Sequence, residues 1–209
     1  QGCEPAVRAA RRALQLRAEM CHFTTNLQYY LMWEVLEAAR TEFVARADAA
    51  ADLDELVGAH EDYLATLLRK ALLDEGSAHL RATLGALLDN MLGLAGVVRR
   101  LNEAVQGADR VTTERARRIQ ARVASGQWGT VAGEEAGDPW PPGEVGAIAR
   151  RVEELAAAHA RALQTFTDQL PAQAHDEVRF LLYRLDFNDF ARRRTADDAG
   201  GAGAMDVDG

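Results

Sequence analysis

Glu19 and His22 form the step in this chain that most resembles part of a metal-binding motif. Three residues apart on a helix, a carboxylate and an imidazole lie on one face. Di-iron carboxylate bundles need two such Glu-x-x-His steps and a further Glu from each of two other helices. None of the other histidines follows a Glu by three residues. We therefore expect no metal site, and we expect structural or interface roles for His22 and His60.

Nucleophilic and phosphate chemistry also lack the residues that they need. Neither the two cysteines, Cys3 and Cys21, nor the serines are placed in a strained turn with a nearby orienting pair. The sequence contains no glycine-rich loop of the kind that holds phosphates. Two cysteines are too few for a disulfide framework, which favours a reducing compartment. We expect a protein that is not an enzyme and that uses no cofactor.

Two short segments combine aromatic residues with polar residues that neither a helix nor a core requires. They are Gln28-Tyr29-Tyr30 and Arg184-Leu185-Asp186-Phe187-Asn188. Successive residues on a helix face every direction, so some of these side chains must point away from the core. An exposed Tyr, Arg and Asn cluster is typical of a protein–protein hot spot.

The pattern leaves an alternative open, in which the aromatics fill the core and Arg184 and Asp186 form a surface pair worth less than about 1 kcal/mol. If the segments do bind a partner, the candidate contact residues are Gln28, Tyr29, Tyr30, Arg184, Asp186 and Asn188.

Charge and hydropathy exclude several classes of partner. The formal net charge is −8, and Lys70 is the only lysine. This acidic balance argues against a general nucleic-acid binder. The basic cluster Arg115, Arg117, Arg118 and Arg122 could meet an acidic partner, but such a run on a long helix is usually a solvated face. No apolar run approaches the roughly 18 residues of a membrane span, so we expect no membrane insertion and an intracellular protein. The first residue is Gln1, which suggests a fragment.

Helix-forming residues dominate the chain and strand signals are nearly absent, which predicts an all-α fold. We expect an elongated multi-helix bundle of about five helices, over residues 5–47, 52–72, 77–124, 144–170 and 175–193. Asp52 and Glu55 form a capping box at the start of the second helix, and Ser77 caps the third. Glycines and prolines make residues 125–143 a long mobile loop. Residues 195–209 have almost nothing to bury, so we expect a disordered tail after a helical region over residues 1–194.

The third predicted helix carries apolar residues at alternating steps of four and three. They are Leu80, Leu84, Leu87, Met91, Leu94, Val98, Leu101 and Val105. By itself this heptad pattern is that of a coiled coil. Further apolar residues at Leu88, Leu92 and Val97 widen the stripe, which favours packing in a multi-helix bundle. A helical adaptor that dimerises through these heptads remains an alternative function.

Short motifs spread over residues 16–190 resemble the gamma-tubulin complex component family in their order and spacing. They are Met20-Cys21-His22-Phe23, Gln28-Tyr29-Tyr30, Glu34-Val35-Leu36-Glu37, Asp52-Leu53-Asp54, Ala59-His60-Glu61, Leu72-Leu73-Asp74, Gly126-Gln127-Trp128-Gly129 with Glu134-Glu135, Arg179-Phe180-Leu181, and Arg184-Leu185-Asp186-Phe187-Asn188. The Gly-Gln-Trp-Gly motif favours the component 3 branch of that family. The Ala/Gly/Asp tail and a short loop after Gln127-Trp128 depart from the family pattern.

This resemblance implies the later part of a C-terminal gamma-tubulin-binding helical domain. It implies a scaffold subunit of the gamma-tubulin ring complex, which templates microtubule nucleation at a centrosome or spindle pole in the cytoplasm. The implied partners are gamma-tubulin and other gamma-tubulin complex components, with no nucleic acid. Any guanine nucleotide in such a complex would belong to gamma-tubulin.

Overall fold

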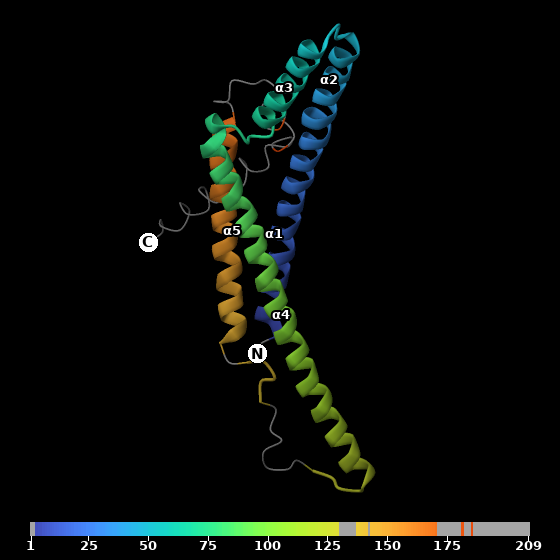
Figure 1. The fold of residues 1–209 in the computed structure, drawn as a ribbon. Helices are drawn as coiled ribbons and strands as arrows, with labels where there is room; N and C mark the ends of the chain where they lie inside the picture. Colours follow the sequence, from blue (N-terminus) through green and yellow to red (C-terminus); the bar gives the residue numbers. More distant parts are fainter. Residues whose placement is uncertain (1–2, 130–136, 142, 171–180, 182–184, 186–209) are drawn as a thin grey trace, which may run out of the picture. The chain divides into compact units, whose positions relative to one another are not determined.

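The computed structural model describes residues 3–129, 137–141, 143–170, 181 and 185 (Figure 1). All regular structure in these residues is helical, and no strand occurs among them. In chain order the elements are α1 (Cys3–Tyr29), the π-helix η1 (Tyr30–Glu37), α2 (Ala38–Ala49), α3 (Leu53–Lys70), the 3-10 helix η2 (Glu75–Ser77), α4 (Ala78–Ala124) and α5 (Glu144–Gln169).

The helix content was predicted correctly, but the number of long helices was not. Three helices are long, α1, α4 and α5, with 27, 47 and 26 residues. We expected about five helices. The predicted helix 5–47 is present as α1, η1 and α2, with the π-helix in its middle. The predicted helix 175–193 and the predicted tail 195–209 lie outside the described residues, apart from Leu181 and Leu185, which are helical.

The start of α3 follows from the predicted capping box. Asp52 has an extended backbone, and its Oδ1 accepts from the Glu55 N–H at 2.9 Å. Glu55 Oε2 in turn accepts from the N–H of Ala51 at 2.8 Å, one residue before the predicted partner. The bond to Asp52 pairs a backbone donor of the first helical turn, and the bond from Ala51 ties the residue before the N-cap to the same turn.

The ends of α3 and α4 use the same backbone arrangement with different residues. After α4, Gly126 has a φ of 77°, and the N–H groups of Gly126 and Gln127 donate to the carbonyls of Val123 and Arg122. After α3, Leu72 has a φ of 63°, and the N–H groups of Leu72 and Leu73 donate in the corresponding way to carbonyls of the last turn. This is a Schellman motif, which favours glycine at the left-handed position. Leu72 is therefore a strained residue.

The loop after α4 begins and ends where the sequence predicted. α4 ends at Ala124 and α5 begins at Glu144. Trp128, at the start of this loop, is exposed and does not pack on the helices. Residues 130–136 and 142 of the predicted mobile loop lie outside the described residues.

The chain divides into two compact units, and the first consists of Gln1–Glu19 and Leu88–His159. Its core joins α1, α4 and α5. Small residues on α1 allow close helix approach, and the Arg12 guanidinium reaches Glu153 of α5 at 3.2 Å. The buried apolar residues are Ala6, Ala9, Ala13, Leu16, Leu94, Val97, Leu101, Ala104, Ala108, Val145, Ile148, Val152, Leu155 and Ala156.

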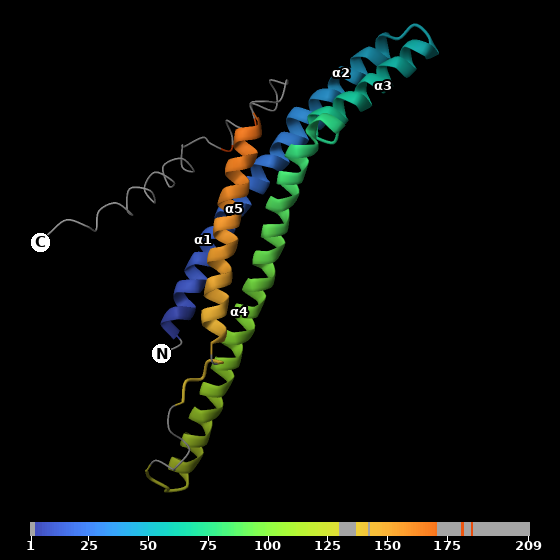
Figure 2. The same cartoon turned by 90° about the vertical axis from the view of Figure 1, so that its left-hand side faces the viewer.

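The second unit consists of Met20–Leu87 and Ala160–Gly209. Figures 1 and 2 both show α3 folding back along α2. Phe23 of α1 meets Phe166 of α5 edge to face, with ring centroids 5.7 Å apart. The Thr83 hydroxyl of α4 donates to Gln169 of α5 at 3.1 Å. The buried apolar residues are Met20, Phe23, Tyr30, Val35, Ala39, Ala59, Leu72, Leu80, Leu87, Phe166, Leu170 and Leu181.

The heptad leucines of α4 are used inside the chain. Leu80, Leu87, Leu94 and Leu101, seven residues apart, are all buried. The intervening heptad positions are half-buried, except for Val105, which is exposed. The expectation that Leu88 and Leu92 widen the buried stripe is wrong, because both are exposed; only Val97 does so.

No helix in the described part of the chain combines the length and the apolar content that crossing a bilayer requires.

Candidate functional site

The candidate site lies at η1, where the helical run of α1, η1 and α2 changes from α-helical to π-helical hydrogen bonding. At the end of η1, the N–H of Ala38 bonds to the carbonyl of Trp33, five residues back, and also to that of Val35. π-Helical turns are rare and are frequent at functional sites. The predicted Gln28-Tyr29-Tyr30 segment runs directly into this π-helix.

Two buried residues hold η1 against the core. Tyr30 is completely buried, and its hydroxyl donates to the backbone carbonyl of Lys70, at the end of α3, at 2.9 Å. Val35 is also buried. The phenol hydroxyl thus donates to a carbonyl in the last turn of α3, the part of a helix where carbonyls rely on partners outside the regular helical pattern. Tyr30 therefore fixes the end of α3 to the start of η1.

The opposite side of the segment carries four large side chains that remain exposed. Their exposed fractions are 50% for Tyr29, 51% for Met32, 61% for Trp33 and 44% for Leu36. Tyr29 and Trp33 are four residues apart, as are Met32 and Leu36, so each pair shares a face. We call these four residues the aromatic patch. Aromatic residues and methionine are enriched at protein–protein interfaces, and Trp and Tyr dominate hot spots.

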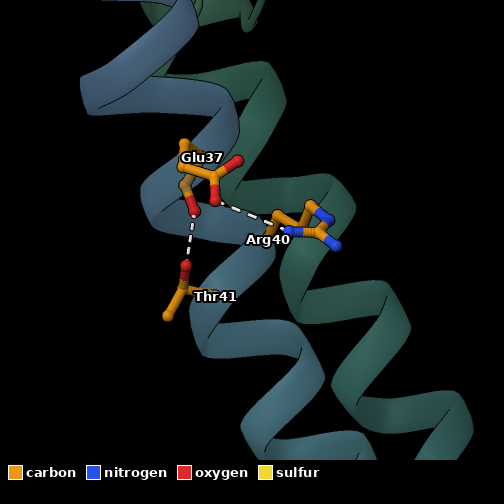
Figure 3. A network of polar contacts seen from close by, with 3 residues as sticks. All are labelled: Glu37, Arg40 and Thr41. Atoms are coloured by element: carbon orange, nitrogen blue, oxygen red, sulfur yellow. Dashed lines mark hydrogen bonds and ion pairs between the residues drawn. The ribbon is translucent and has the colours of Figure 1, made fainter.

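A small polar network marks the junction between η1 and α2 (Figure 3). The Glu37 carboxylate accepts from Arg40 at 3.5 Å, and the Glu37 carbonyl accepts from the Thr41 hydroxyl at 2.9 Å. Both bonds link residues three or four positions apart, which is ordinary α-helical spacing. Glu37 is the last residue of η1 and directly follows Leu36 of the aromatic patch, so the network marks where the α-helix resumes.

Aromatic contacts fix α2 to α3 beyond the junction. The Phe43 ring stacks on Tyr63 with centroids 4.9 Å apart, and it meets His60 at 5.8 Å. Arg46 and Asp62 form an ion pair at 2.7 Å. These contacts hold the element that carries the aromatic patch, and they give His60 a packing role.

The described residues contain no group of three or more His, Cys, Asp or Glu side chains placed to hold a metal ion. His22 is exposed, and its backbone carbonyl accepts from the Asn26 amide at 2.8 Å. Cys3 and Cys21 are both free and exposed.

The structure separates the residues that the sequence grouped as candidate contacts. Gln28 and Tyr29 are exposed, while Tyr30 lies in the interior. The other three candidates, Arg184, Asp186 and Asn188, lie outside the described residues. We therefore keep Gln28 and Tyr29 as candidate surface residues and assign Tyr30 to positioning the segment.

Sequence reasoning missed Met32, Trp33 and Leu36 as surface residues. A signal for them was present, because with Tyr29 they occur at i, i+3, i+4 and i+7, the spacing of one helix face. Leu31 is half-buried and Val35 is buried on the inward face, which leaves the second apolar stripe without a core to fill. Two apolar faces on one helix indicate that one of them serves a partner.

A comparison with family models decides the family. The model described as gamma tubulin complex component C-terminal matches residues 3–190, most of this chain. The chain belongs to this family. The match includes the whole of α1, η1 and α2, and therefore the aromatic patch.

Curated relatives agree with the family match. Gamma-tubulin complex component 3 of Arabidopsis thaliana is 34% identical over 186 residues, which cover 88% of this chain and 22% of the relative. Its Homo sapiens counterpart is 32% identical over 189 residues, covering 86% of this chain and 20% of the relative. Spindle pole body component alp6 of Schizosaccharomyces pombe is 26% identical over 174 residues, with coverages of 83% and 19%. The chain thus spans about a fifth of the length of these relatives.

Proposed function

We propose that this chain is a gamma-tubulin-binding part of a scaffold subunit that templates microtubule nucleation. Membership of the gamma-tubulin complex component family supports a role in that complex. The observation that carries the binding proposal is the aromatic patch, which exposes Trp33 and Tyr29 on a helix whose opposite face is anchored by Tyr30.

The proposed mechanism is noncovalent and needs no catalytic group. A subunit that holds one gamma-tubulin beside those of its neighbours supplies in advance the lateral order of a microtubule end. Free tubulin subunits lose translational and rotational freedom when they reach that order unaided. A rigid anchored helix suits this task, because a preorganised contact surface loses little conformational entropy on binding.

The aromatic patch can supply binding energy of the required size. Removing a hot-spot Trp or Tyr typically weakens binding by 2 kcal/mol or more, which is over about tenfold in affinity. Gln28, exposed beside Tyr29, would add a polar contact at the rim. We propose that Arg184, Asp186 and Asn188 contribute polar contacts as well; Arg184 and Asn188 are four residues apart, which is one helical face.

The proposed partners are gamma-tubulin and other gamma-tubulin complex components. The proposed location is a microtubule-organising centre of the cytoskeleton, a centrosome or spindle pole. Two relatives carry the name spindle pole body component, one of them from Schizosaccharomyces pombe and the other from Dictyostelium discoideum. The alternative of a dimerising coiled-coil adaptor is less favoured, because the heptad residues Leu80, Leu87, Leu94 and Leu101 are buried within the chain.

Capture of purified gamma-tubulin by the immobilised chain tests the proposal. The Tyr29→Ala/Trp33→Ala variant should capture at least about tenfold less, and Arg184→Ala/Asn188→Ala tests the second segment in the same way. The matched control is Leu88→Ala/Leu92→Ala, which removes two exposed apolar side chains at the same spacing from α4. The melting temperature should change little in the aromatic double variant, because exposed substitutions usually shift stability by less than about 0.5 kcal/mol. Equal capture by the wild-type chain and by the aromatic double variant would show that gamma-tubulin does not bind at the patch.

A further inference from the structure

A groove between α4 and α5 in the first unit carries a cluster of arginines that the proposed function does not use. Its volume is about 480 Å³. Two Arg-Arg pairs, one from each helix, line this groove. Figure 2 shows α4 and α5, the helices that carry them, side by side. We call this site the arginine groove. It is lined by Gly93, Gly96, Val97, Arg99, Arg100, Ala147, Arg150, Arg151 and Glu154.

Most of the positive charge in the arginine groove is not neutralised within the described residues. Arg151 pairs with Glu154 at 2.9 Å, and Glu154 is the one acidic residue of the lining. Among the described residues, Arg99, Arg100 and Arg150 make no ion pair. Three guanidinium groups without an ion pair in the described part of the chain therefore line one groove of a protein whose net charge is −8. Such a local reversal of sign is a feature of sites that recognise an anionic partner.

The two glycines of the lining have different roles. A Cβ added at Gly93 would lie 3.1 Å from Leu155 Cδ2, so Gly93 allows α4 and α5 to approach each other. A Cβ added at Gly96 would meet no atom within 4 Å. Gly96 thus leaves the floor of the groove open without serving a packing contact. Glycine is a poor helix former, so helix stability does not explain its presence there.

We propose that the arginine groove binds an acidic peptide segment of a partner protein. Carboxylates match the fork of the guanidinium group and form bidentate, charge-assisted hydrogen bonds with it. The small side chains of the floor let a peptide backbone come close, and the volume suits a few residues. A peptide is favoured over a nucleic acid because the chain as a whole is acidic, so a long polyanion would be repelled outside the groove.

Binding of a fluorescein-labelled hexaglutamate peptide to the 209-residue chain, followed by fluorescence anisotropy at low salt, tests this inference. The Arg99→Ala/Arg150→Ala variant should bind at least about tenfold more weakly, because it removes two of the guanidinium groups that would pair with the peptide carboxylates. Arg110→Ala/Arg117→Ala is the matched control, because it removes the same charge from exposed positions of α4 outside the groove.

A second pair of variants separates the groove itself from the charge. Gly96→Leu should fill the floor and weaken peptide binding without changing any charge. Gly107→Leu is its control, because it adds the same side chain at another α4 glycine with open space around its Cβ position. Both changes replace glycine with a better helix former, so the helical content should be kept.

Three results would overturn the inference. The first is that the wild-type chain does not bind hexaglutamate. The second is that the Arg110→Ala/Arg117→Ala control weakens binding as much as the groove variant, or that Gly96→Leu binds like the wild type. The third is that a single-stranded oligonucleotide binds more tightly than the peptide and depends on the same arginines, which would assign the groove to nucleic acid instead.

Discussion

Tyr29 and Tyr30 are neighbours in the chain but lie on opposite sides of their helix. Tyr29 is half exposed, whereas Tyr30 is completely buried with its hydroxyl on the Lys70 carbonyl. A buried phenol needs such a partner, because an unpaired polar group in the interior is costly. Tyr30 therefore belongs to the machinery that positions the aromatic patch, and its influence on any partner is indirect.

Replacing Tyr30 with Phe should keep the buried ring and remove the hydrogen bond from the hydroxyl to the Lys70 carbonyl. The free energy of unfolding should fall by about 1 kcal/mol, the usual net value of a buried hydrogen bond, as measured by urea denaturation. Tyr63→Phe is the matched control, since it keeps the ring that stacks on Phe43. A Tyr30→Phe chain as stable as the wild type would contradict the anchoring role of this hydroxyl.

Leu72 is a buried residue held in a backbone conformation that suits glycine. Its φ of 63° is unfavourable for a side chain with a Cβ by roughly 1–2 kcal/mol. Its burial compensates for this strain, since filling a core site with leucine in place of alanine is worth about 2–5 kcal/mol.

This balance between strain and burial predicts an unusual order of stability among variants at position 72. Leu72→Gly should be no less stable than Leu72→Ala, because glycine relieves the strain that alanine keeps. At Leu87, buried in the interior of α4, the order should be the ordinary one, with glycine about 1 kcal/mol worse than alanine. Thermal unfolding of the four variants checks this. Glycine being clearly worse than alanine at both positions would show that Leu72 is not strained.

At the scale of elements, the linker between α3 and α4 is held by polar contacts. Arg81 of α4 donates to the carbonyls of Leu72 and Asp74 at 3.3 Å and 3.0 Å. The hydrogen bond from the Ser77 side chain is the main cause that lowers the pKa of Asp74 below its ordinary value, and the charge of Arg81 acts in the same direction. Ser77 stands directly before α4, and its N–H donates to the Asp74 carbonyl at 3.3 Å. That its hydroxyl caps α4 stays a prediction.

The side-chain contact between Ser77 and Asp74 makes part of the stability of the linker depend on pH. Because the folded-state pKa of Asp74 is lowered, the ionised carboxylate stabilises the fold above its unfolded-state pKa. That contribution is lost as the pH falls through the folded-state pKa. Ser77→Ala should raise the pKa of Asp74 toward its ordinary value in a carboxyl NMR titration. Ser125→Ala, at the other end of α4, should leave that titration unchanged. An unaltered Asp74 titration in Ser77→Ala would show that the hydroxyl does not act on this carboxyl.

Local signals predicted the helix boundaries well, because caps are made by neighbouring residues. Asp52 and Glu55 start α3, and Gly126 ends α4, all through bonds within about five residues. The π-helix was not predicted, since the choice between bonds four and five residues back depends on tertiary anchors such as Tyr30 and the distant carbonyl of Lys70.

The residues of the surface sites were also hard to predict, because their exposure depends on contacts between residues far apart in the chain. The sequence could show that some residues of the Gln28-Tyr29-Tyr30 segment must be exposed, but not that Tyr30 is the buried one. The arginine groove could not be predicted, because Arg99 and Arg150 come together only when α4 and α5 pack. Met32, Trp33 and Leu36 could have been predicted from their spacing with Tyr29.

At the scale of the whole molecule, the burial of the α4 heptad leucines distinguishes gamma-tubulin binding from the dimerising adaptor. A dimerising adaptor needs them free for a second chain, whereas here the leucines at seven-residue spacing are buried within the chain. A gamma-tubulin-binding role instead uses the aromatic patch, which is exposed on the second unit. We therefore expect a chain that is monomeric by itself and that associates with gamma-tubulin.

Analytical ultracentrifugation of the chain, by itself and mixed with purified gamma-tubulin, tests this claim most directly. We expect a 22.8 kDa monomer at all concentrations in the absence of a partner. With gamma-tubulin we expect a one-to-one complex, which the Tyr29→Ala/Trp33→Ala chain fails to form while the Leu88→Ala/Leu92→Ala chain still forms it. A concentration-dependent dimer of the chain, with gamma-tubulin sedimenting separately, would favour the dimerising adaptor and rule out the gamma-tubulin-binding role.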